Sequence, residues 1–133
     1  MNRRRVIRRA AAGLALALCA SACAAPRAAL GTAASPCFRA LASAKTAVHG
    51  NGRLVGAHHV TGGTVDRTYP GVVSPRPRHA CLVGFSGGFR SDSVDLPNGA
   101  ASGRYAVVVV TTHQWRALAT VVTDRLPHGL RHR

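Results

Sequence analysis

The sequence predicts an α+β domain in which one N-terminal helix packs on a four-stranded, mostly antiparallel sheet. A segment with apolar residues at helical spacing comes first, and apolar or alternating runs rich in β-branched residues follow it. Clusters of Gly, Pro and Asn separate these runs and mark the turns. At 133 residues, the chain has room for one such domain with a small core.

The predicted helix covers residues 36–48. Ser35 can cap its free amide groups, and Pro36 suits the first helical position. Four residues recur at helical spacing and form one buried stripe: Cys37, Leu41, Ala44 and Val48. The sequence His-Gly-Asn-Gly that follows ends the helix, because Gly or Asn can adopt the left-handed cap conformation.

The predicted strands cover residues 53–61, 79–85, 104–111 and 115–122. In the second strand, alternation places Cys81, Val83 and Phe85 on one face of the sheet. The third strand holds four consecutive valines, which indicates a buried position in the sheet.

Loops are predicted between these strands. Residues 62–78 and 86–103 are rich in Pro, Gly and polar side chains, and Pro cannot join a central ladder of hydrogen bonds. Residues 112–114 form a short connection between the last two strands. We expect a single domain over 35–127, followed by a loose basic tail at 128–133.

The first 22 residues have the three parts of a secretory signal peptide. A basic segment at 2–9 precedes an uncharged apolar run at 10–20, which is too short to span a bilayer as a permanent helix. The basic segment includes Arg3-Arg4-Arg5-Val6-Ile7-Arg8, which resembles the pattern of the twin-arginine export route. Both the general secretory route and the twin-arginine route lead out of the cytoplasm, so we expect an exported protein.

The end of this signal, Ala20-Ser21-Ala22-Cys23, resembles the lipobox of bacterial lipoproteins, with Ala20 where that class usually has Leu. The resemblance covers only the first two dozen residues. It implies that the thiol of Cys23 carries lipid and anchors the chain to a membrane of the cell envelope, with the Ala-rich stretch 23–34 as a tether. The same small residues suit the ordinary signal peptidase, and the alternative product is a small secreted or periplasmic soluble domain.

The remaining cysteines indicate a disulfide bond. Cys19 leaves with the signal peptide, which leaves Cys37 and Cys81 in the domain. Two cysteines in an exported domain most often pair with each other. Free thiols or a redox pair are the alternatives, although the Cys-x-x-Cys spacing of thioredoxin-like proteins is missing.

The charge of the chain is strongly positive. It has 18 basic residues and four acidic ones, and all but Lys45 of the basic residues are arginines. Without the five arginines of the signal peptide, 13 basic residues remain and the net charge is +9. Such a charge favours anionic partners, which in the envelope include lipid headgroups and anionic polymers. An Arg-rich, Lys-poor composition is also typical of a GC-rich genome, which is the alternative explanation.

One short motif raises the question of an enzyme. The sequence Gly84-Phe85-Ser86-Gly87-Gly88 resembles the nucleophile elbow of the α/β-hydrolases, and Asp92 or Asp95 and then His113 follow in that family's order. The elbow requires a helix after the serine, whereas a loop is predicted there, and the chain is about half as long as that fold requires. We therefore expect no catalytic activity.

The seven histidines suggest a metal site as a second hypothesis. His58 and His59 are adjacent in a strand and point to opposite faces. A copper or zinc site therefore needs one of them together with His79 and His113 from neighbouring strands, and exposed histidines without a ligand are the simpler interpretation.

We interpret the chain as a non-enzymatic lipoprotein of the cell envelope, anchored through Cys23, whose domain binds or scaffolds an anionic partner. A metal-binding protein and a small secreted domain are the alternatives. Nucleic acid is not an expected partner, because few aromatic residues accompany the basic ones. No motif indicates a cofactor, and we expect none.

Overall fold

The computed structural model describes residues 36–131. The predicted signal peptide, the lipid acceptor Cys23 and the tether at 23–34 lie outside the described residues, as do the last two residues of the predicted tail. Within the described part, no helix is both long enough and apolar enough to cross a membrane.

A mixed sheet of five strands forms the centre of the domain, in the order β1-β2-β4-β5-β3. Its strands are β1 Arg53–Thr61, β2 His79–Arg90, β3 Pro97–Gly99, β4 Ser102–Thr111 and β5 Ala117–Thr123. The helices are α1 Ala40–Ala47 and α2 Gly62–Thr68, with short 3-10 turns at Ser91–Ser93 and His128–Leu130. All strand pairs are antiparallel except the short β3–β5 pair. The α+β class is confirmed, but the prediction of one helix and four strands was too simple.

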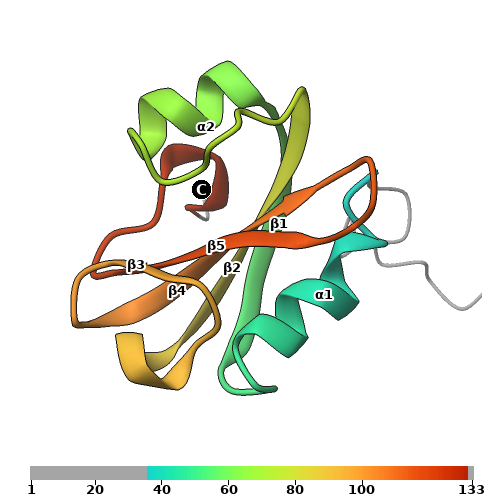
Figure 1. Ribbon diagram of the computed structural model, residues 1–133. Coiled ribbons are helices and arrows are strands. Elements are labelled where there is room, and N and C mark those ends of the chain that lie inside the picture. The colour runs from blue at the N-terminus through green and yellow to red at the C-terminus, as the bar shows by residue number, and fades with distance from the viewer. Residues whose placement is uncertain (1–35, 132–133) are drawn as a thin grey trace, which may run out of the picture.

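Helices cover both faces of the sheet. Helix α1 lies on one face, whereas α2 and the turn His128–Leu130, here called the C-terminal turn, lie on the other (Figure 1). Cys81, Val83 and Phe85 of β2 face α1, as their alternation predicts. The valines of β4 alternate between the two apolar clusters, so this inner strand is buried on both sides.

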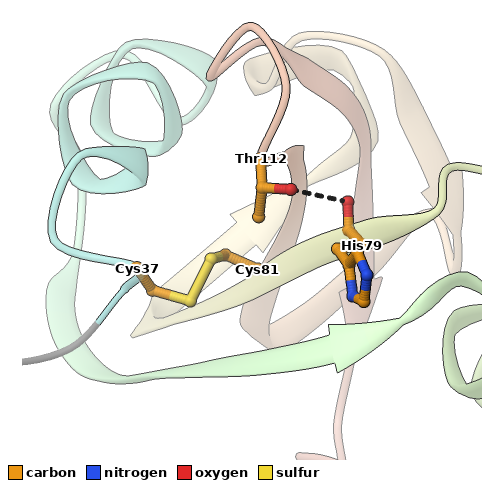
Figure 2. The surroundings of a disulfide bond; sticks show 4 residues. All are labelled: Cys37, His79, Cys81 and Thr112. Carbon is orange, nitrogen blue, oxygen red and sulfur yellow. Dashed lines mark hydrogen bonds between the residues drawn. A yellow bond between two sulfur atoms is a disulfide. The ribbon is translucent and has the colours of Figure 1, made fainter.

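The disulfide between Cys37 and Cys81 is confirmed. The two Cα atoms are 5.6 Å apart, and both residues are fully buried. The bond joins the turn that precedes α1 to the inner strand β2 (Figure 2). Beside it, the Oγ1 atom of Thr112 donates a hydrogen bond of 3.3 Å to the backbone oxygen of His79 (Figure 2). The start of the described chain is therefore fixed to the middle of the sheet.

The boundaries of the first helix differ from the prediction of 36–48. Residues 36–39 form tight turns, in which the Ala40 amide donates to the Cys37 carbonyl at 3.0 Å, and the α-helix begins only at Ala40. At the other end, His49 takes the left-handed conformation (φ 53°) just before Gly50 (φ 73°). Its imidazole lies 2.8 Å from a carboxylate oxygen of Asp95, which holds the residue in place.

The prediction of a continuous loop at 62–78 was wrong, because α2 begins directly after β1. Thr61 caps this helix, since its Oγ1 atom accepts a hydrogen bond of 3.3 Å from the Thr64 amide. Gly62 is required there, because a Cβ atom would lie 1.8 Å from the Pro77 carbonyl oxygen. Helix α2, whose residues were predicted to form a loop, is therefore held between β1 and the loop that leads to β2.

The second predicted loop, 86–103, was also wrong in part. Strand β2 continues past Phe85 to Arg90 through a bulge between Ser86 and Phe89. Gly87 and Gly88 supply the positive φ angles of the bulge (148° and 76°), and Phe89 then returns to the core at 4% exposure. Further along this segment, β3 pairs in parallel with β5.

The predicted loose tail is packed as far as the structure describes it. Leu130 in the C-terminal turn is only 4% exposed and joins the apolar cluster beneath α2. The turn lies against β1 and β2. The folded domain therefore extends beyond residue 127, because an apolar residue in the tail finds space on the sheet.

Candidate functional site

The candidate site begins with three side chains in one row across the sheet. Arg53 of β1 lies opposite Ser86 of β2, and Ser86 lies opposite Tyr105 of β4. Residues directly opposite each other in antiparallel strands share a face of the sheet. Tyr105 packs against the apolar cluster that includes Leu126 and Leu130, so this row lies on the face covered by the C-terminal turn.

The segments around this row line a pocket of about 780 Å³ that is open to solvent. We call it the arginine pocket, because four arginines line it: Arg53, Arg104, Arg125 and Arg131. Its other polar lining consists of Ser86, Tyr105 and Asp124, and its apolar lining consists of Leu54, Val55 and Leu126. Arginine guanidinium groups match the geometry of phosphate and carboxylate oxygens, so the lining favours an anionic ligand.

Backbone oxygens hold two of the arginines in position. The Nε atom of Arg131 donates a hydrogen bond of 2.7 Å to the Leu126 carbonyl oxygen. An Nη atom of Arg104 donates to the Asp124 carbonyl oxygen at 3.4 Å, and its guanidinium carbon lies 5.8 Å from the ring centre of Tyr105. Each guanidinium group has five N–H donors, so most donors of both side chains remain available for a ligand.

The positive charge of the pocket exceeds its negative charge, because four arginines and one acidic residue line it. The carboxylate of Asp124, the only acid in the lining, accepts a hydrogen bond of 3.1 Å from the backbone amide of Arg104. The ion pairs of the described residues lie elsewhere and comprise His49–Asp95, Arg76–Asp66 and Arg90–Asp92. An anion that enters the pocket therefore meets guanidinium groups without a carboxylate partner.

The serine of the hydrolase-like motif lies in this pocket, but the rest of the catalytic set does not surround it. No helix follows Ser86, because β2 continues through it. Asp95 pairs with His49, and His113 follows the end of β4 that lies far from Tyr105. Asp92 pairs with Arg90, and the hydrogen bond from that guanidinium lowers the pKa of Asp92 below its usual value.

Packing explains the first glycine of the motif. A Cβ atom on Gly84 would lie 3.0 Å from a methyl carbon of Leu130 and 3.4 Å from one of Leu126. Gly84 thus leaves the space in which the C-terminal segment lies on the sheet. Of the motif, Ser86 lines the arginine pocket, and the strand continues through it without the helix that a nucleophile elbow requires.

The structure brings two of the candidate metal ligands together. The rings of His59 and His79 are stacked, with their centres 5.3 Å apart. Neither His58 nor His113 joins them, and the described residues contain no group of three or more His, Cys, Asp or Glu side chains that could hold a metal ion. The proposed set of one histidine from β1 with His79 and His113 is therefore not formed.

No protein-family model, curated protein or solved structure matches this chain. The geometry of the arginine pocket is therefore the basis for the proposed function.

The sequence did not identify the arginines of this pocket as a group. Arg53 and Arg104 each stand at the start of a predicted strand, and Arg125 follows the end of another. That placement at strand ends is the signal that could have been used, because ends of neighbouring antiparallel strands meet at one edge of a sheet. The position of Arg131 was not accessible in this way, since it depends on the packing of the C-terminal turn.

Proposed function

We propose that this chain is an exported, non-enzymatic lipoprotein of the cell envelope, tethered through Cys23, whose domain binds an anionic envelope polymer. The arginine pocket is the observation that supports the binding role, because it gathers four arginines around a single carboxylate, and none of the four forms an ion pair within the described residues. The lipobox-like sequence at 20–23 supports the tether.

A polymer suits this site better than a layer of lipid headgroups. The arginines that line the pocket come from β1, β4 and the segment after β5, so a flexible polymer can follow them along the lining. Of the three large exposed apolar side chains in the described residues, Phe38 and Leu96 lie outside the lining and only Leu54 belongs to it, so the pocket has a single apolar group of the kind that inserts into a membrane.

Replacing Arg104 should weaken anion binding. We expect Arg104→Gln to lower the affinity for inorganic triphosphate about tenfold, which corresponds to the loss of one hydrogen bond to a charged group. Titration calorimetry at low ionic strength measures this change, and added salt should weaken the binding of both proteins.

The matched control for this experiment is Arg39→Gln. Arg39 is exposed, precedes α1 and is not part of the pocket lining, so its replacement removes the same charge from a different place. Equal losses of affinity in the two variants would show that only the net charge matters. A membrane surface would be favoured as the partner if the protein bound vesicles of anionic phospholipid far more tightly than soluble polyanions.

The tether makes a separate prediction. Protein purified from its own membranes should have an intact mass that corresponds to a chain starting at Cys23 with attached acyl groups. The reason is that the Cys23 thiol carries the lipid and that cleavage before Cys23 leaves this residue at the N-terminus. An unmodified mature chain would instead support the secreted soluble domain, and the binding role of the pocket would remain to be judged from the calorimetry.

A further inference from the structure

A second pocket lies next to the arginine pocket, beside the C-terminal turn. It has a volume of about 350 Å³ and is lined by β1, by α2 and by the segment from Pro127 to Arg131. We call it the histidine pocket, because His58 and His128 line it. Arg131 lines both pockets, so they meet at this side chain.

The polar groups of the histidine pocket are suited to anions. No acidic residue lines it. The hydroxyl group of Thr68 already donates to the Thr64 carbonyl oxygen at 2.8 Å, and the hydroxyl of Thr64 contacts Thr61. The donors that remain for a ligand are those of Arg131 and the two imidazoles, and an imidazole can donate a hydrogen bond in either protonation state.

The position of His58 is determined by the fold. Its ring lies against Gly129 of the C-terminal turn, where a Cβ atom would come within 2.8 Å of the ring carbon Cδ2. The ring is thus held between β1 and the turn. The same turn carries Arg131, so one short segment positions groups in both pockets.

Together, the two pockets are too long for a single small anion. Arg53 and His58 lie opposite Ser86 and Leu82 of β2, which are four residues apart and therefore roughly 13 Å apart along the strand. Arg53 and Tyr105 lie two strands apart, which adds roughly 10 Å across the sheet. One phosphate group can contact only the donors within hydrogen-bond distance of its oxygens, about 3 Å, so it leaves most of these groups unused.

We propose that the ligand of this site is a linear polyanion that occupies both pockets and passes from one to the other at Arg131. One part of the chain binds the guanidinium groups of the arginine pocket, and the next part binds Arg131 and the imidazoles of His58 and His128. This proposal rests on the proposed function of the arginine pocket and adds the histidine pocket as a second site for the same polymer.

The dependence of affinity on chain length tests this proposal. Inorganic triphosphate and long-chain polyphosphate are titrated into the purified full chain and its variants at low ionic strength. For the wild-type protein, we expect the long chain to bind at least about tenfold more tightly than triphosphate, because the second pocket is engaged without a new association step. His58→Gln should remove most of this gain, and it should weaken the binding of triphosphate much less than Arg104→Gln does.

His113→Gln is the matched control, since His113 is also exposed and lies outside both pockets. It should preserve the gain with chain length. Thermal unfolding checks that each variant is folded. If His58→Gln does not fold, His128→Gln takes its place. The two-pocket proposal would be overturned if the increase in affinity with chain length were as large in His58→Gln and His128→Gln as in His113→Gln. Failure of the proposed function would give a different result. In that case triphosphate would not bind, or Arg104→Gln would not weaken its binding.

Discussion

Reduction of the Cys37–Cys81 disulfide should lower the free energy of unfolding by about 3–4 kcal/mol. The bond joins residues 44 positions apart, and opening this loop returns conformational freedom to the unfolded chain. Domains of this size have a total stability of about 5–15 kcal/mol, so the loss is a large share of it. Urea unfolding with and without reductant, followed by the fluorescence of the single tryptophan, Trp115, measures the change.

The double variant Cys37→Ala/Cys81→Ala is the control for this experiment. It should be about as unstable as the reduced wild-type protein, and reductant should not change its unfolding curve. Because it retains Cys19 and Cys23, any effect of those residues on the wild-type curve would appear in the variant too. The same unfolding midpoint for oxidised and reduced wild-type protein would contradict the stabilising role of the bond.

Truncation of the Leu130 side chain should both destabilise the domain and weaken anion binding. Leu130 fills the space above Gly56 and Gly84, where Cβ atoms would lie 3.6 and 3.0 Å from its methyl carbons. Replacing a buried leucine by alanine removes apolar contacts and leaves a cavity, and we expect a loss of about 3 kcal/mol in the free energy of unfolding. Arg131 follows directly, so release of the turn also displaces a guanidinium group that lines both pockets.

Urea unfolding and triphosphate titration of Leu130→Ala measure the two effects. Leu96→Ala is the matched control, since Leu96 is 51% exposed and outside both pockets, and it should change neither quantity appreciably. If Leu130→Ala had the stability and the triphosphate affinity of the wild-type protein, the C-terminal turn would not be part of the folded domain or of the site.

The sequence predicted best where a segment has a strong pattern of its own. Strand β1 has the predicted bounds 53–61, and the valine run of β4 is buried as expected. The strands that are buried on one or both faces must place apolar residues at fixed positions, and this requirement is visible in the sequence. The pairing of Cys37 with Cys81 also followed from the sequence, because no other cysteines remain in the domain.

The elements that were missed depend on contacts with distant segments. Helix α2 contains two glycines and few strong helix formers, and its one local signal is the cap residue Thr61. Strand β3 has only three residues and is defined by its parallel pairing with β5. The extension of β2 beyond Phe85 requires a bulge at two glycines, which by composition alone resemble the end of a strand.

The candidate site was predicted only as a property of the whole domain. An excess of basic residues indicated an anionic partner, whereas the serine motif and the histidines drew attention to chemistry that the fold does not assemble. The arginines of the pocket come from β1, β4 and the segment after β5, and the only signal that relates three of them is their placement at strand ends.

The sequence by itself determined the α+β class, the positions of the central strands, the disulfide and the sign of the charge, because periodicity, cysteine number and composition are local or summed properties. Only the tertiary structure decided where the arginines gather on the surface of the domain. The packing of Leu130 over Gly84 places Arg131 in the lining of the same pocket as Arg104, and of the histidine pocket as well. Such contacts join residues far apart in the chain, and they form because the apolar side chain fits a space that two glycines leave on the sheet.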